Sequence, residues 1–171
     1  MSDALSAAIR RQIRDGGLAV IAELKQRRYE GVELLGRRSA RKIASSYQAA
    51  GAAAISVVTS RLFGGSMRLL EEAASADTGL PLLRKDLICC DRDVRESKQA
   101  GASAVLLVLS LMDLSRIVDL AQSVREQNME PFVEVSTPDE IEQLLYVMAH
   151  GEGVPIAGSN QRLLPGLTDQ L

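Results

Sequence analysis

Apolar side chains along this chain gather in short runs that are separated by longer stretches of mixed polarity. The runs are apolar at consecutive positions and rich in valine, isoleucine, leucine and alanine, which is typical of strands buried on both faces. Six such runs predict strands, at residues 18–24, 52–58, 81–85, 104–109, 131–135 and 154–158. The regular return of a strand after each intervening stretch predicts a parallel sheet.

The stretches between the runs repeat their apolar residues every three or four positions, which is the period of a helix with one buried face. They predict helices at residues 66–76, 91–100 and 112–127, with another that includes residues 47–50. The first 17 residues predict a short amphipathic helix that ends at Gly16 and Gly17. A last helix is predicted to start at Pro138, where Thr137 is the N-cap and Glu140 completes a capping box.

An internal repeat helps to choose between the possible parallel-sheet folds. Residues 50–60, AGAAAISVVTS, realign on residues 100–110, AGASAVLLVLS, with six of eleven positions identical. No G-x-G-x-x-G motif opens the first helix after a strand, so a dinucleotide-binding sheet loses its best support. We therefore expect an α/β fold, a parallel (β/α) barrel of TIM type with about six strand–helix units. Because a complete barrel has eight units, we expect an incomplete one, a single shortened domain over residues 1–171 with an N-terminal helix at residues 1–17.

Charged and amide side chains follow the apolar residues at the ends of four predicted strands. Alternation along a strand places Leu83 and Lys85 on the same face, so a buried Leu83 puts Lys85 at the mouth of the core. The same design recurs at the ends of three other strands, at Glu23 and Lys25, at Glu134, and at residues 158–162. Because the site of a parallel barrel is assembled from the carboxyl ends of several strands, we expect one shared site there.

The composition limits the class of protein, its partners and the compartment in which it works. The 171 residues are 46% hydrophobic with a formal net charge of −2, which suits one soluble domain with a sizeable core. The near-neutral balance argues against nucleic acid as a partner, and no apolar run is long enough for a membrane span. Cys89 and Cys90 are adjacent, so they offer neither a disulfide framework nor zinc-ligand spacing. The N-terminus lacks the apolar segment of a signal peptide, and we expect a cytoplasmic protein.

The motifs at these strand ends resemble those of the indole-3-glycerol-phosphate synthase family, the lyases that form the indole ring in tryptophan biosynthesis. The family's (V)IAE(I/L)K is similar to residues 20–25, its GAAAISV and FGGS to residues 51–66, and its P(V)LRKDF to residues 81–87, with leucine in place of the phenylalanine. Its GADAVLL is similar to residues 101–107, its VEV to residues 133–135, and its GINNRDL to residues 158–164. The likeness runs from about residue 18 to residue 171, and its ordered motifs make chance a poor explanation.

The resemblance implies a decarboxylative ring closure of an arylamino-deoxyribulose phosphate to an indole. Lys85 is similar to the family's general acid, which protonates the ketone oxygen of the ribulose chain, and Glu134 is similar to its partner carboxylate in proton transfer. Glu23 and Lys25 resemble the pair that holds the substrate and assists the dehydration. A lysine crowded by other cations gives up its proton readily, and we expect Lys85 to have such neighbours in Lys25 and Arg162.

The same resemblance implies the contacts that orient the substrate. Asn160 and Arg162 are similar to the pair that positions the sugar chain and the aromatic carboxylate, and Phe63 resembles an aromatic wall of the pocket. The reaction needs an acid, a base and a cation for the carboxylate, so no metal or organic cofactor is implied. The implied partner is a small aromatic sugar-phosphate substrate.

Departures from the family pattern keep other functions open. The small loop that the family has after its first strand is replaced by QRRYE at residues 26–30, and the family's last two strand–helix units, with their glycine-rich phosphate loops, are absent. The first and sixth strands would then have unpaired edges, which we expect a homo-oligomer to cover. The alternatives are a non-catalytic oligomerising or aromatic-ligand-binding descendant of the family, and an enzyme for a smaller, non-phosphorylated aromatic substrate.

The connection after the first predicted strand is strongly basic. Residues 25–42 hold seven basic and two acidic side chains, a local charge of +5 in a chain of net −2. A solvated loop accounts for most of these arginines. A sharper interpretation is that Arg27, Arg28 or Arg37 replaces the absent phosphate contacts.

Overall fold

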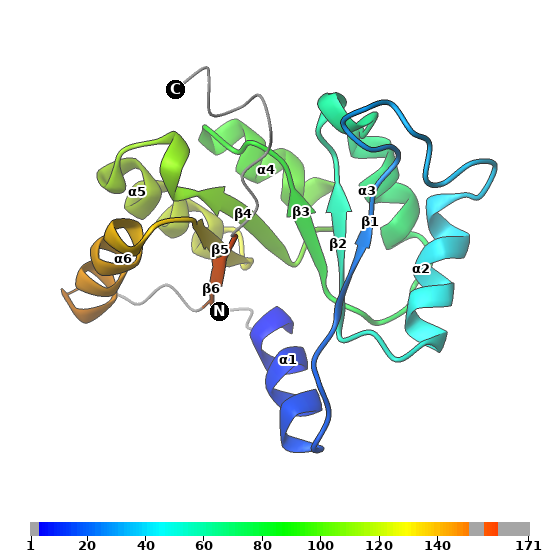
Figure 1. The fold of residues 1–171 in the computed structure, drawn as a ribbon, viewed down its shortest axis with the longest axis horizontal. Helices are drawn as coiled ribbons and strands as arrows, with labels where there is room; N and C mark the ends of the chain where they lie inside the picture. The colour runs from blue at the N-terminus through cyan, green and yellow to red at the C-terminus, as the bar shows by residue number, and fades with distance from the viewer. Residues whose placement is uncertain (1–3, 151–155, 161–171) are drawn as a thin grey trace.

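A single sheet of parallel strands forms the centre of the computed structural model, which describes residues 4–150 and 156–160 (Figure 1). The strands are β1 (Ile21–Leu24), β2 (Ala54–Val58), β3 (Leu82–Lys85), β4 (Ala104–Val108), β5 (Glu130–Val135) and β6 (Ile156–Ser159). Each strand pairs in parallel with the next in sequence, so the spatial order is β1-β2-β3-β4-β5-β6. In a doubly wound sheet the strand order changes direction within the sheet, whereas the order of these six strands does not. The prediction of an incomplete TIM-type barrel is confirmed. Within the described residues β1 and β6 do not pair, and the sheet is an open half-barrel.

Helices alternate with the strands, as the periodicity predicts. They are α1 (Ala4–Arg14), α2 (Ala40–Ala49), α3 (Met67–Ala74), α4 (Asp91–Gln99), α5 (Leu114–Glu126) and α6 (Pro138–His150), with short 3-10 turns η1 (Arg61–Phe63) and η2 (Leu109–Leu111). Helices α2 to α6 lie around the outside of the sheet, whereas α1 lies at the amino ends of the strands (Figure 1). No helix in the described part of the chain has the length and apolar character needed to cross a bilayer.

Two apolar clusters occupy opposite faces of the sheet, because successive side chains of a strand point to opposite sides. The larger cluster packs the outer face against the helices and includes Ile55, Val57, Val105, Leu107 and Ile117. The smaller cluster fills the inner face and consists of Leu5, Ala54, Leu83, Ala104 and Leu106, with partly buried side chains packed around it. Leu5 comes from α1, so this helix covers the amino end of the half-barrel interior.

A buried carboxylate fixes α1 in that place. Glu130, at the start of β5, is 2% exposed and accepts hydrogen bonds from the backbone N–H groups of Leu5 and Ser6. The first N–H groups of a helix have no partner within the helix, and a negative charge there is favoured by the helix dipole. Glu130 therefore caps α1, although it lies more than a hundred positions away from this helix in sequence.

Most element boundaries differ from the predicted ones by one to three residues, and two differences are informative. The first strand begins at Ile21 rather than residue 18, and Leu18 and Val20 before it are 86% and 48% exposed. At the start of α6, Thr137 Oγ1 accepts the backbone N–H of Glu140 as predicted. The Glu140 carboxylate, however, accepts the N–H of residue 136 rather than that of the N-cap, so the reciprocal half of the box lies one residue earlier.

Candidate functional site

The carboxyl ends of β1 and β3 are joined by an ion pair on the inner face of the sheet. Lys85 Nζ lies 2.8 Å from Glu23 Oε2, and the two side chains are 40% and 39% exposed. Glu23 is aligned with Ser56 of β2, which is aligned with Leu83 of β3, so the pair stands directly above the inner cluster. The pair is open to solvent from above and rests on apolar side chains below, as a reactive lysine at the mouth of a core would be.

A second polar pair joins the ends of β5 and β6. Asn160 Nδ2 donates a hydrogen bond of 3.0 Å to Glu134 Oε1, and both residues are half-buried. Glu134 is aligned with Gly158, so Asn160 lies two residues further along the same face of β6. The amide orients the carboxylate, and in the described part of the chain no hydrogen bond is given to its other oxygen.

The third pair places a cation on an aromatic ring. The Lys25 ammonium lies 3.9 Å from the centroid of the Phe63 ring, within the range of a cation–π interaction. Phe63 ends η1, and the two glycines after it make the turn possible. Gly64 has φ +69°, and a Cβ on Gly65 would lie 2.3 Å from the carbonyl oxygen of Val58. The FGGS sequence therefore serves to bring the ring back over the end of β1.

The structure joins the predicted residues in pairs that differ from the expected ones. The resemblance implies a partnership between Lys85 and Glu134, but the described side chains show no ion pair between these two. Strand β4 separates their strands, so the backbones are about 10 Å apart. The described partner of the Lys85 ammonium is the Glu23 carboxylate, which we expected as one of its counter-charges. Arg162 lies outside the described residues.

Sequence reasoning missed a buried network directly behind Lys85. Arg84 is 6% exposed and faces the helices, where it donates to Thr59 Oγ1 at 3.1 Å and to Ser97 Oγ at 2.9 Å. It also donates to the backbone carbonyl of Asp93 at 3.0 Å and pairs with Asp86 at 3.2 Å. The sequence contains the information needed to find Arg84. Alternation along β3 places its side chain on the buried outer face, because Lys85, the next residue, faces inward.

Asp93 links this network to the start of α4. Its Oδ2 accepts the backbone N–H groups of Cys89 and Cys90 and the thiol of Cys90, at 3.0, 3.1 and 3.3 Å. Burial raises the pKa of the Asp93 carboxyl, but these hydrogen bonds and the nearby charge of Arg84 outweigh it. The net result is a pKa below the ordinary value for aspartate, so the charged form is the one that stabilises the fold.

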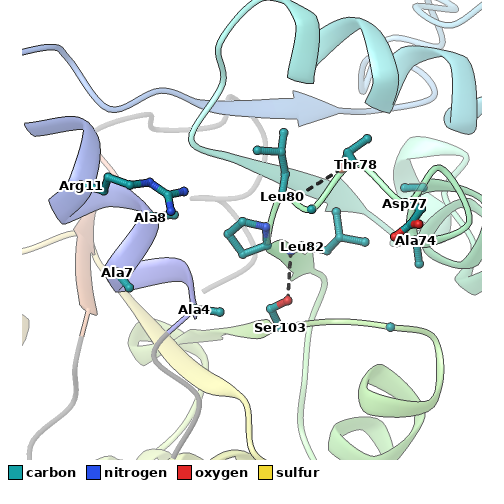
Figure 2. Close-up of a pocket in the computed structure, with 14 residues that line it drawn as sticks. Ala4, Ala7, Ala8, Arg11, Ala74, Asp77, Thr78, Leu80, Leu82 and Ser103 are labelled. Carbon is teal, nitrogen blue, oxygen red and sulfur yellow. Dashed lines mark hydrogen bonds between the residues drawn. The ribbon is translucent and has the colours of Figure 1, made fainter. Parts of the chain in front are cut away.

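A cavity lies at the opposite end of the strands. It has a volume of about 460 Å³ and is bounded by α1 on one side and by the segments that lead into β3 and β4 on the other (Figure 2). Ser103 and Thr78 in its wall are tied by hydrogen bonds to the backbone N–H groups of Leu82 and Leu80. None of the predicted site residues lines this cavity. Its position at the amino ends of the strands is the end of a (β/α) barrel that serves stability rather than chemistry.

Comparison with known proteins agrees with the order of the motifs. The model of the family described as indole-3-glycerol phosphate synthase matches residues 2–169. Curated indole-3-glycerol phosphate synthases from Burkholderia ambifaria (strain MC40-6) and Nocardioides sp. (strain ATCC BAA-499 / JS614) are 38% and 37% identical to this chain over 158 and 155 residues. These alignments cover 92% and 90% of this chain but 58% and 57% of the relatives, so the chain spans less than two thirds of their length.

Among solved structures, the crystal structure of the tryptophan synthase alpha chain from Legionella pneumophila subsp. pneumophila is similar in fold. The TM-score is 0.63 over 99% of this chain and 71% of that chain, with 12% sequence identity. At that level of identity the likeness supports the barrel-type fold alone.

Proposed function

The chain belongs to the indole-3-glycerol phosphate synthase family, and on that basis we propose that it is a carboxy-lyase of that type. The reaction closes an arylamino-deoxyribulose phosphate to an indole and releases carbon dioxide and water. The observation that carries the proposal is the pair formed by Lys85 and Glu23, a lysine and a carboxylate in contact at the carboxyl rim of a parallel half-barrel. The proposal places the reaction in the cytoplasm, as a step in tryptophan biosynthesis.

In the first chemical step, Lys85 acts as the general acid. It gives a proton to the ketone oxygen while the ring carbon that carries the carboxylate bonds to the ketone carbon. Carbon dioxide then leaves from that ring carbon, and its bonding electrons restore the aromatic ring. The Glu23 carboxylate, 2.8 Å from the ammonium, holds the lysine in place.

The second step removes the new hydroxyl as water. This dehydration needs one proton for the leaving hydroxyl and the loss of one proton from the neighbouring carbon. We assign these transfers to Glu134, with Lys25 and Glu23 assisting from the end of β1. Asn160 orients Glu134 through its 3.0 Å hydrogen bond, which gives it a positioning role in addition to its proposed contact with the sugar chain. We assign the aromatic carboxylate to Arg162 and one wall of the ring pocket to Phe63.

The test is an indole-fluorescence assay on the purified protein. Because the chain has no tryptophan, the product signal is read against a low background. Lys85→Ala is expected to abolish turnover, whereas Lys98→Ala, which changes an exposed lysine on α4, is expected to leave it unchanged. Turnover that survives in Lys85→Ala, or absence of turnover in the unaltered protein, would contradict the proposal.

A second candidate function is favoured by the edges of the sheet. The sheet has free edges at β1 and β6 within the described residues, and the chain spans 58% of its relatives. A non-catalytic descendant that binds an aromatic ligand or oligomerises through these edges is the corresponding alternative. It predicts that the protein binds an anthranilate-like ligand in a calorimetric titration and forms no indole. An enzyme for a smaller, non-phosphorylated aromatic substrate would turn over a substrate that lacks the phosphate.

A further inference from the structure

A second cavity lies beside β1, between α2 and the basic segment at residues 25–39. It has a volume of about 250 Å³. Leu35 and Ile43, each 6% exposed, are the buried apolar side chains in its lining. Arg38 and Lys42 also line it, at the approach to α2 and in its first turn. A pocket that combines apolar side chains with two cations has the features of a site for a small charged ligand.

Arg38 is held in position before any ligand arrives. Its Nε donates to the carbonyl of Leu35 at 3.2 Å and its Nη2 donates to the carbonyl of Leu34 at 2.9 Å. A guanidinium has five N–H donors, so other donors remain for a ligand. No hydrogen bond or ion pair involves the Lys42 ammonium in the part of the chain that the structure describes.

The charge of this pocket is not balanced from within. Lys25, Arg38 and Lys42 are its three cations and Glu23 is its single carboxylate, which gives a net charge of +2. The Glu23 carboxylate is already paired with Lys85 outside the pocket. The hydroxyl groups of Ser46 and Tyr47, which also line the pocket, are neutral and do not offset this positive charge.

We propose that this pocket is a binding site for a small tetrahedral oxyanion, inorganic phosphate or a phosphate monoester. Arg38 comes from the segment before α2 and Lys42 from the helix itself, and Lys25 follows β1 with its ammonium over the Phe63 ring. Cations from different elements suit an anion with oxygens in several directions better than a planar carboxylate. Arg27, Arg28 and Arg37 do not line this cavity.

Tyr47 provides a local reporter for the test. Its hydroxyl lines the pocket region and donates to the carbonyl of Glu23 at 2.8 Å. Burial raises the pKa of Tyr47, the charge of Arg38 lowers it and the charge of Glu23 raises it. A bound phosphate adds negative charge beside the phenol, so it is expected to raise the pKa of Tyr47 further.

The experiment titrates the full chain with inorganic phosphate and follows the NMR signals of labelled tyrosine rings. Three tyrosines are present, and Tyr47→Phe assigns the signal. Phosphate is expected to shift the Tyr47 signal and its titration, whereas chloride at the same ionic strength is not. Lys42→Gln is expected to weaken phosphate binding by about tenfold, the effect of one charge-assisted hydrogen bond. Arg41→Gln, one residue earlier on α2 and outside the cavity lining, is the matched control and is expected to change the affinity less than about twofold.

The outcomes separate this site from the proposed reaction. Lys85→Ala is expected to retain phosphate binding, so a failed indole assay leaves the inference standing. Equal effects of Lys42→Gln and Arg41→Gln, or equal responses to phosphate and chloride, would overturn it. Benzoate that binds as tightly as phosphate would overturn the preference for a tetrahedral anion. If Lys42→Gln fails to fold, the comparison of phosphate with chloride on the unaltered protein decides alone.

Discussion

Arg84 and Lys85 are neighbours in β3, and their side chains point to opposite faces of the sheet. Lys85 is 40% exposed at the inner rim, whereas Arg84 is buried among the side chains of the outer face. A buried guanidinium is tolerated only when its donors are satisfied, and the contacts to the loop after β2 and to α4 provide this. One step along the strand therefore separates a residue available for chemistry from one that holds the scaffold.

The first prediction concerns Arg84. Arg84→Ala leaves the Asp86 carboxylate without its ion-pair partner and removes the link to α4, so the free energy of unfolding is expected to fall by about 3–5 kcal/mol. Urea denaturation followed by circular dichroism measures it. Arg68→Ala, which removes an ion pair with an 83% exposed arginine side chain, is the control and is expected to leave the midpoint nearly unchanged. Similar losses in the two variants would show that the buried network adds little.

The second prediction concerns the pH dependence of stability. The pKa of Asp93 is lower in the folded than in the unfolded chain, so its contribution is fully present above the ordinary aspartate value of about 4 and is lost as the pH falls through the folded value. The difference in unfolding free energy between the unaltered chain and Asp93→Asn is expected to be constant near neutrality and to shrink below about pH 4. Denaturation curves at a series of pH values check this, and a difference that grows on acidification would contradict it.

The sequence located the site residues at the strand ends but not their contacts. Glu23, Lys85 and Glu134 stand where alternation and strand order predict. Their partners could not be predicted, because the reach of Lys85 across β2 to Glu23 depends on strand register and on a side-chain rotamer. Asn160 meets Glu134 for the same kind of reason, since the register of β6 against β5 decides which residues face each other. The roles given to these residues in catalysis remain predictions.

At the scale of secondary structure, α1 depends on one distant residue. Its first N–H groups are satisfied by Glu130, which belongs to β5. An amphipathic period predicts that residues near the N-terminus form a helix. It cannot predict the strand that caps the helix, because a long-range contact leaves no local trace in the sequence.

The third prediction tests this tether. Glu130→Ala is expected to cost about 1–2 kcal/mol, as the loss of a helix cap does, and to speed hydrogen exchange in Ala4–Arg14 while β4 keeps its protection. Glu130→Gln retains an acceptor and is expected to show a smaller effect. Exchange measured by mass spectrometry distinguishes them, and uniform loss of protection across the chain would point to global rather than local destabilisation.

The basic segment after β1 shows a second limit of pattern reading. The predicted solvated loop is largely exposed, at residues 28–34 and 36–39, but it also contains local structure that was not predicted. Arg27 and Glu33 form an antiparallel bridge, and Gln26 donates a side-chain hydrogen bond to Glu33 at 3.0 Å. A single bridge is too short to produce a period-two pattern. The strands and helices that carry an extended apolar pattern were predicted, with boundaries displaced by up to three residues at β1.

At the scale of the whole molecule, the dominant feature is that β1 and β6 end the sheet without pairing with each other in residues 4–150 and 156–160. Unpaired strand edges offer backbone groups to other chains, and natural proteins seldom leave them bare. One such group on β1 is already covered, because the Tyr47 hydroxyl donates to the Glu23 carbonyl. Just before β1, Val20 is 48% exposed.

The fourth prediction is that these edges drive the formation of a homo-oligomer. Light scattering at micromolar concentration is expected to show a mass above that of one chain. Val20→Lys adds a charge beside the β1 edge and is expected to lower the average mass. Val118→Lys, a comparable change at a 40% exposed position on α5, is the control and is expected to leave it unchanged. A monodisperse monomer in the unaltered protein would contradict the prediction.

The inner cluster of the half-barrel is thin, and this has a consequence for how its interior can be altered. Two of its members are alanines, Ala54 and Ala104, and its base is supplied by Leu5 of α1 rather than by the strands. The floor of the half-barrel interior therefore belongs to a helix that carries none of the reactive groups. A larger side chain in the first turn of that helix would crowd the interior, and a smaller one would loosen it, without a change in any residue of the rim.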